Sequence, residues 1–190
     1  MMSINFAMLF VANDVVGENT YLALFYIPFA LGILKNFLEI FVFKDKQKVS
    51  DKQLPSGAYL YPSLDVDYLL TEVLRDRKPV AVVRNPHLFE KHELPILWLS
   101  KVRKENAVSP THLEKILHWA VTTVTSEDAL IIDGVEYLIL ENGFEPVFRF
   151  LVNLKDQILL KNSVLILVVD ERALEEKHIF LLQREFKKIL

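Results

Sequence analysis

From residue 58 onward, short unbroken apolar runs alternate with segments in which apolar residues recur at helical spacing. The runs are AYLY (58–61), VAVVR (80–84), ILWL (96–99), ALIID (129–133) and SVLILVVD (163–170). They contain many β-branched residues and do not alternate with polar ones, which is typical of strands buried on both faces. The pattern therefore predicts five buried strands.

The segments between and after these runs have the start signals and the spacing of amphipathic helices. We expect Ser63 to cap the first helix, Ser109 and Pro110 to begin the second, Pro146 to open the third, and the last to start near Leu174. The residues expected to face the core are Val66, Leu69, Leu70, Val73, Leu74, Leu113, Ile116, Leu117, Ala120, Val121, Val124, Leu151, Leu154, Ile158, Ile179, Leu182, Phe186 and Ile189.

Strands that alternate with helices form βαβ units, and these units build parallel sheets that are covered on both sides. We therefore predict an α/β domain over residues 58–190, with three layers (α/β/α) and a mainly parallel five-stranded sheet. The connection NPHLFEKHELP (85–95) is expected to hold only a short helical turn.

Ahead of this domain the pattern changes, because residues 21–34 carry no charge. The apolar stretch extends to Phe43, and a helix over residues 21–43 would be about as long as the hydrocarbon core of a bilayer is thick. Lys35 and Glu39 count against a membrane span, although they stand four residues apart and could pair. We expect residues 1–43 to be a membrane anchor. The alternative is an apolar helix that packs on the domain or on a partner.

The charges around this stretch favour one orientation in the membrane. No Lys or Arg precedes Lys35, whereas KDKQKVSDK (44–52) contains four Lys. Because positive charge is enriched on the cytoplasmic side, we expect residues 58–190 to be a cytoplasmic domain at the cell membrane. The polar residues 44–57 end in Pro-Ser-Gly and are expected to form a linker.

The amino-acid composition excludes several kinds of binding site. The absence of Cys excludes disulfides and thiolate metal sites, and the His spacing favours no zinc site. A net charge of −3, with basic and acidic residues interleaved, argues against nucleic-acid binding. None of the five Gly forms a phosphate-cradling loop, and acidic Asp65 and Asp67 follow the first run. We therefore expect no bound cofactor or metal and assign no catalytic residue.

Ligands of open α/β sheets bind beyond the carboxyl ends of the strands. The polar residues at those positions that we select as ligand-binding candidates are Ser63, Arg84, Ser100, Asp133 and Glu136. Each has an ordinary explanation as well: Ser63 would cap a helix, Arg84 would pair with a carboxylate, and Ser100 would begin a loop.

Asp133 is the most informative of these residues, because it follows four buried apolar residues and therefore needs a hydrogen-bond or charge partner. One interpretation is a group that holds magnesium or positions water. The other is a structural carboxylate that accepts hydrogen bonds from a neighbouring connection. Under the second interpretation, Asp133→Ala would cost about 1–3 kcal/mol in stability.

From about residue 57 to the end, the chain resembles an archaeal family known as domain of unknown function 835. The segments that carry the resemblance are YLYP, ILWLS (96–100), LIIDGVEYLILENGFEPVFRFL (130–151), NSVLILVVD and LLQREF. The resemblance implies membrane attachment through N-terminal apolar helices, but it implies no activity. The order of motifs is also similar to degenerate RecA/KaiC-like ATPases that lack the phosphate loop, with ALIIDG in the place of their second acidic motif.

These observations favour a non-catalytic, membrane-tethered module that senses a ligand or docks a partner in signalling. The alternatives are a nucleotide-dependent hydrolase that uses Asp133 and Glu136, and a structural membrane-assembly protein. The expected partners are the lipid bilayer, through residues 21–43, and a protein partner or a second copy of the chain.

Overall fold

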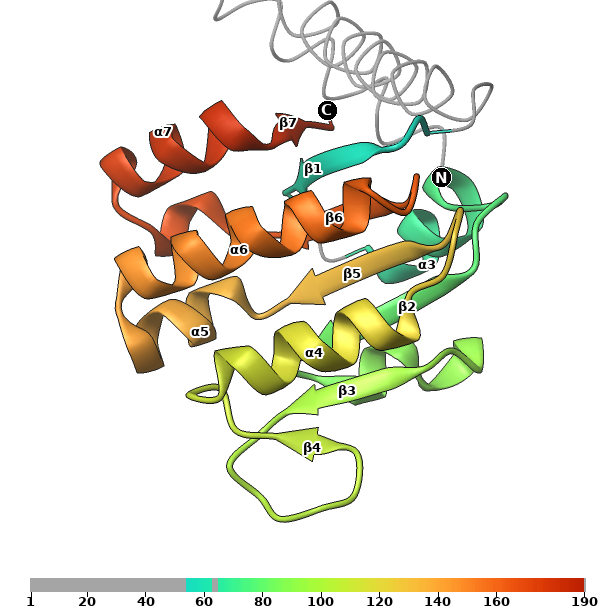
Figure 1. Cartoon of the computed structure of the whole chain (residues 1–190), viewed down its shortest axis with the longest axis horizontal. Coiled ribbons are helices and arrows are strands. Elements are labelled where there is room, and N and C mark those ends of the chain that lie inside the picture. Colours follow the sequence, from blue (N-terminus) through green and yellow to red (C-terminus); the bar gives the residue numbers. More distant parts are fainter. Residues whose placement is uncertain (1–53, 63–64, 190) are drawn as a thin grey trace, which may run out of the picture. The chain divides into compact units, whose positions relative to one another are not determined.

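The computed structural model describes residues 54–62 and 65–189. The expected membrane helix 21–43, most of the linker 44–57 and Ser63 lie outside these ranges. The described chain forms one seven-stranded sheet with the strand order β4-β3-β2-β5-β6-β1-β7, and every neighbouring pair is parallel (Figure 1).

All five predicted strands are present. They are β1 (Gly57–Tyr61), β2 (Pro79–Val83), β3 (Ile96–Leu99), β5 (Ala129–Asp133) and β6 (Val164–Val168). Along β5, Leu130 and Ile132 pack on one side of the sheet while Ile131 packs on the other, and all three are fully buried. Burial on both faces is the reason that these strands are unbroken apolar runs.

The prediction of five strands was wrong by two short edge strands. β4 (Ala107–Val108) pairs with the end of β3, and β7 (Lys187–Lys188) pairs with the middle of β1. Two residues are too few to show any periodicity, and the two Lys of β7 are exposed. The charged side chains of β7 protect this edge of the sheet from pairing with other chains, so the composition of β7 is the opposite of a buried run.

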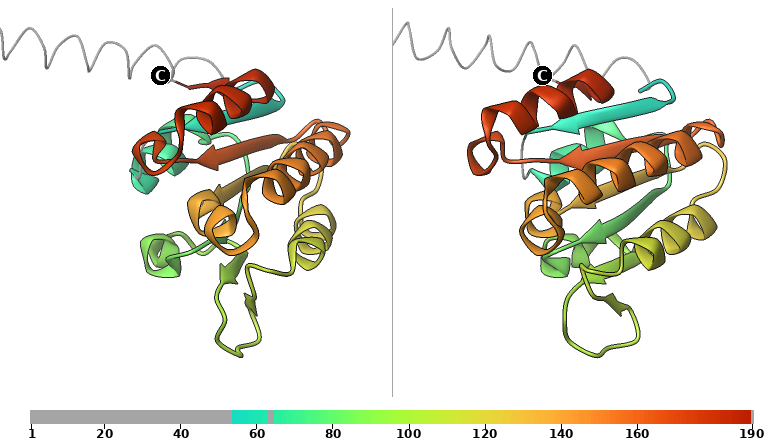
Figure 2. Two further views of the ribbon diagram at one scale, coloured as in Figure 1. Left: turned by 90° about the vertical axis from the view of Figure 1, so that its left-hand side faces the viewer. Right: turned by 60° about the vertical axis from the view of Figure 1, so that its left-hand side comes forward.

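Two layers of helices cover the sheet. The helical elements are α3 (Val66–Tyr68), the π-turn η1 (Leu69–Val73), the 3-10 helix η2 (Pro86–His92), α4 (Leu113–Thr123), α5 (Val135–Asn142), α6 (Phe144–Leu159), the 3-10 turn η3 (Glu171–Ala173) and α7 (Glu176–Glu185). One face of the sheet packs against α4, α5, α6 and α7, and the other packs against η1 and η2 (Figures 1 and 2). The three-layer prediction and the short helical turn in the β2–β3 connection are confirmed.

The helix starts differ from those expected. Asp65 accepts a hydrogen bond from the amide of Tyr68 and caps α3. Ser109 does not cap α4; its hydroxyl bonds to the Thr111 hydroxyl in the turn before the helix, and His112 stands at the N-cap. Pro146 lies in the first turn of α6 rather than opening it, because Gly143 separates α6 from α5, a helix that was not predicted.

Arg77 ties three connections together at the amino-terminal edge of the sheet. Its guanidinium donates hydrogen bonds to the backbone carbonyls of Glu127 and Leu54, each at 3.0 Å, and to that of Asn162 at 3.5 Å. These carbonyls belong to the segments that lead into β5, β1 and β6. One side chain therefore fixes the entry points of three central strands.

Replacement of Arg77 by Met is expected to lower the free energy of unfolding by about 2 kcal/mol, because three hydrogen bonds from a charged group are lost, one of them partly buried. Chemical denaturation of the full chain would measure this change. Arg149→Met is the matched control, because Arg149 is exposed and, among the described residues, forms an ion pair only with Glu145 at i,i+4, worth at most about 0.5 kcal/mol. Equal losses in the two variants would contradict a special role for Arg77.

Candidate functional site

The sheet has a topological switch point between the adjacent strands β2 and β5. The chain leaves β2 toward η2, whose Phe89 packs on one face, and leaves β5 toward α5, whose Leu138 packs on the other. Because the two connections diverge, a crevice opens beyond the carboxyl ends of the strands, where α/β sheets bind ligands.

This crevice is a cleft of about 590 Å³, which we call the switch-point cleft. Its lining residues are Pro62, Arg84, Asn85, Leu88, Asp133, Gly134, Glu136, Tyr137, Val168, Val169, Asp170, Arg172 and Ala173. They come from the ends of β1, β2, β5 and β6 and from the first turns that follow. The cleft combines apolar walls with a small number of converging charged groups, which is the composition of small-molecule sites.

Gly134 allows the two strand ends to come close together. Its φ of +104° lies in the left-handed region, and a Cβ at this position would stand 3.0 Å from the Cβ of Arg84. The backbone N–H of Arg84 donates to the carbonyl of Asp133 at 3.1 Å. A glycine is therefore required here both by the backbone conformation and by the lack of space.

The Asp133 side chain lies on the same face as its register partner Val168, which packs with η1 and η2. The pKa of the Asp133 carboxyl is raised to about 6, first because burial penalises the charged form and second because the Glu136 carboxylate is nearby. The backbone N–H groups of Arg84 and Asn85 act in the opposite sense, since they stabilise the ionised form. Asp133 therefore faces the start of the β2–β3 connection, as expected for a carboxylate with a structural role.

Glu136 joins the ends of two strands. It lies in the first turn of α5, and its carboxylate accepts a hydrogen bond of 2.5 Å from the backbone N–H of Asp170, just beyond β6. The Asp170 side chain in turn accepts two bonds of 2.9 Å from the Arg172 guanidinium, an arrangement that lowers the pKa of Asp170. The β6 side of the cleft is thus held in place by charge-assisted hydrogen bonds.

Arg84 occupies the opposite side of the cleft. Its guanidinium lies 4.3 Å from the centre of the Tyr137 ring and donates to the Leu99 carbonyl at 3.1 Å. The indole N–H of Trp98 donates to the Arg84 carbonyl at 3.1 Å. Within the described ranges Arg84 forms no ion pair with a carboxylate, so the pairing suggested by its sequence position is wrong. Contact with an aromatic ring takes its place.

The structure brings Arg84, Asp133 and Glu136 together in one cleft. Ser100 lies elsewhere: it is buried, accepts a hydrogen bond from the Val102 amide at 3.2 Å and lines a second cleft near β4. Ser63 lies outside the described residues. Among the described residues, no group of three or more His, Asp or Glu is placed to hold a metal ion.

Sequence reasoning missed Tyr137, Leu88 and Arg172 as cleft residues. Tyr137 follows Glu136 directly and could have been included once a helix was assigned to residues 135–142. Leu88 is 43% exposed, and its place in the cleft depends on how η2 folds back over the end of β2. The sequence gives no indication that Arg172 lines the cleft, because its position there depends on its hydrogen bonds to Asp170.

The raised pKa of the Asp133 carboxyl can be tested with the variant Asp133→Asn, which removes the charge but keeps an acceptor oxygen. The pKa of Asp133 is about 6 in the folded wild type and 3.8 in the unfolded chain. Between these values the folded state binds the proton more tightly, so the stability of the wild type falls as the pH rises through this window. The stability of the Asn variant relative to wild type should therefore increase between pH 4 and pH 8, by up to about 3 kcal/mol.

Urea denaturation across this pH range would measure the difference. Asp156→Asn, at an exposed carboxylate on α6, controls for the change in net charge. A difference between the Asp133 variant and wild type that does not change with pH would contradict the raised pKa.

The family model described as "Protein of unknown function (DUF835)" matches residues 62–186. This range includes every residue that lines the switch-point cleft and covers well over half of the chain. No curated protein and no solved structure gives a significant match. The resemblance noted in the sequence is thus confirmed, and the chain belongs to the DUF835 family of proteins of unknown function.

Proposed function

We propose that this domain is a non-catalytic ligand-sensing module and that its ligand binds in the switch-point cleft. The observation that carries the proposal is the convergence of Arg84, Asp133 and Glu136 where the connections from β2 and β5 diverge. A cleft at such a position, with apolar walls and a few converging polar groups, is the default binding site of an open α/β sheet. A raised pKa in the same cleft supports the assignment.

The lining of the cleft favours a small ligand with an apolar body and a hydrogen-bond donor. Leu88, Val168 and Ala173 provide apolar surface, while Asp133 provides an acceptor. Across the cleft, the Arg84 guanidinium has donors beyond the one used by Leu99 and favours an acceptor group on the ligand.

Binding rather than catalysis fits the state of these polar groups. Glu136 is engaged by the Asp170 amide, and the Asp133 carboxyl faces the amides of Arg84 and Asn85. Side chains that are already held by the protein form a rigid recognition surface. The alternative, a nucleotide-dependent hydrolase, would use Asp133 but would have to hold phosphate beside β1, where Asp65 caps the next helix.

We further propose that residues 21–43 attach this module to the cell membrane, with the α/β domain in the cytoplasm. The support for this proposal is the uncharged stretch 21–34 and the Lys-rich segment that follows residue 43. In the part of the chain that the structure describes, no helix has the length and apolar character needed to cross a bilayer. Docking of a signalling partner or of a second copy remains compatible with this arrangement, as does a role in membrane assembly.

A thermal-shift screen of the purified full chain against metabolites, including ATP and GTP with Mg²⁺, would test the sensing function. A ligand at 100 times its Kd should stabilise the fold by about 2.7 kcal/mol. Arg84→Gln should remove this shift, whereas Arg149→Gln, at an exposed arginine outside the cleft, should keep it.

Two outcomes would count against the proposal. A shift that survives Arg84→Gln would place the ligand outside the switch-point cleft. Turnover of ATP or GTP that is abolished by Asp133→Asn would support the hydrolase instead.

Fractionation of cells that express the protein would test the tether. The full chain should sediment with membranes and require detergent for release, while residues 52–190 alone should stay in the supernatant. A full chain that is soluble and monomeric without detergent would refute membrane attachment.

A further inference from the structure

A second cleft, of about 620 Å³, lies at the β4 end of the sheet, within the β3–β4 loop and the turn before α4. Its lining residues are Ser100, Lys101, Val102, Arg103, Lys104, Glu105, Ala107, Val108, Ser109, His112 and Lys115. None of them lines the switch-point cleft. We call it the basic cleft; the β3–β4 loop that forms much of it projects from the domain beyond the edge strand (Figures 1 and 2).

Positive charge dominates this lining. Lys101, Arg103, Lys104 and Lys115 contribute four cations, and Glu105 contributes one carboxylate. This excess is local, since the whole chain has a net charge of −3.

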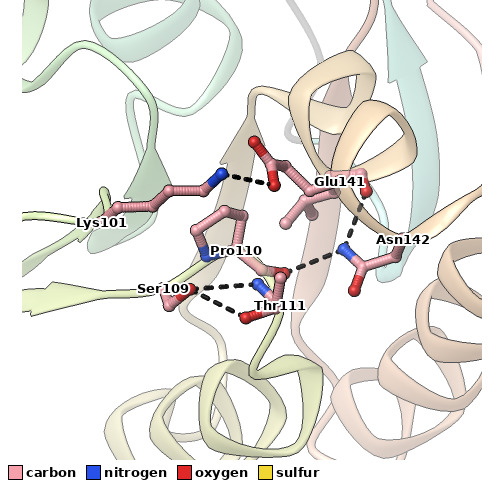
Figure 3. Close-up of polar contacts among 7 residues, drawn as sticks. Lys101, Ser109, Pro110, Thr111, Glu141 and Asn142 are labelled. Carbon is pink, nitrogen blue, oxygen red and sulfur yellow. Dashed lines mark hydrogen bonds and ion pairs between the residues drawn. The ribbon is translucent and has the colours of Figure 1, made fainter.

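One of the four cations is neutralised by the protein itself. The Lys101 ammonium pairs with the carboxylate of Glu141, on α5, at 2.8 Å (Figure 3). The Glu141 side chain is only 19% exposed, so this contact fixes one wall of the cleft.

The other three cations have no such partner. Within the described ranges, neither Arg103, Lys104 nor Lys115 forms an ion pair, and the nearest aromatic contact is that of Lys104, at 6.0 Å from the centre of the Trp98 ring. Other cations on the surface of the domain form ion pairs, as Lys177 does with Glu175 and Lys188 with Glu171. Cations that converge in excess over the neighbouring carboxylates raise the local potential and attract an anion.

The frame of the basic cleft is held in place by polar contacts (Figure 3). The Asn142 amide donates to the Pro110 carbonyl at 3.0 Å and to the Leu138 carbonyl at 2.8 Å, which ties the turn before α4 to α5. The hydroxyls of Ser109 and Thr111 bond to each other at 2.9 Å. The turn therefore presents α4 in a fixed position.

The start of α4 adds to the positive potential. His112, at its N-cap, lines the cleft, and its side chain does not cap the first N–H groups of this 11-residue helix. The amino end of a helix carries a partial positive charge, which adds to the charges of Arg103 and Lys115.

We propose that the basic cleft binds a multiply charged phosphate group, either on a soluble compound or on the headgroup of an anionic lipid. Arg103, Lys104 and Lys115 form no ion pair among the described residues, and against the one carboxylate of Glu105 they leave an excess of two positive charges. This excess matches the charge of a phosphate group better than that of a single carboxylate. Arg103 offers a planar fork that matches phosphate oxygens, and Lys104 and Lys115 act as point charges around it. The site is separate from the switch-point cleft, so the proposal does not depend on the ligand-sensing function.

The test uses the full chain with Arg103→Gln/Lys104→Gln as the cleft variant and Lys78→Gln/Lys91→Gln as the matched control. The control removes two exposed lysines outside the cleft. Arg103 and Lys104 are exposed on a loop, so both variants should fold, which urea denaturation would verify. One arm measures the thermal shift with inorganic pyrophosphate. The other measures the extra sedimentation with phosphatidylglycerol-containing vesicles over vesicles of phosphatidylcholine alone, a difference that cancels any apolar attachment.

In at least one arm, the cleft variant should bind about tenfold or more weakly than wild type, while the control binds like wild type. An effect with pyrophosphate alone would identify a soluble phosphate, and an effect with vesicles alone would identify a lipid headgroup. Equal losses in both double variants would mean general charge attraction and would overturn the site. An unchanged cleft variant in both arms would overturn it as well.

Discussion

The arrangement of the whole domain depends on the close contact between the ends of β2 and β5. At Gly134 the chain must turn away from the sheet with a φ of +104° and with Arg84 only 3.0 Å from the space of a Cβ. That turn sends α5 to one face while the segment after Arg84 goes to the other. If the two connections left on the same face, there would be no crevice, and Asp133 would be covered by its own connection.

This geometry also accounts for the unusual state of Asp133. Its neighbours in β5 are fully buried, so the carboxyl enters the cleft from a low-dielectric environment. The raised pKa is the result of this burial together with the nearby Glu136, and the amides of Arg84 and Asn85 limit the rise. The contact between the ends of β2 and β5 thus shapes the cleft and also influences the pKa of Asp133.

The two clefts on the carboxyl edge differ in charge and in construction. The switch-point cleft holds opposite charges that are fixed by hydrogen bonds, as Glu136 is by the Asp170 amide. In the basic cleft, three cations form no ion pair among the described residues. Both clefts lie within the range of the family match.

The amino-acid sequence by itself determined the five long strands, the parallel sheet and the core faces of most helices. Strands buried on both faces leave unbroken apolar runs, and helices buried on one face leave apolar residues at helical spacing. It also singled out Asp133, since a carboxylate after four buried residues is rare and costly. Local sequence could not reveal β4 and β7, because a two-residue edge strand is defined by the strand beside it.

Only the tertiary structure decided which strand ends meet. Arg84 and Asp133 are 49 positions apart in the sequence (133 − 84), yet a hydrogen bond joins their backbones. Ser100 follows the last residue of β3, much as Asp133 ends β5, but strand order places it at the other cleft. The physical reason is that strand order and the face of each connection depend on contacts between distant segments, which no local pattern of residues encodes.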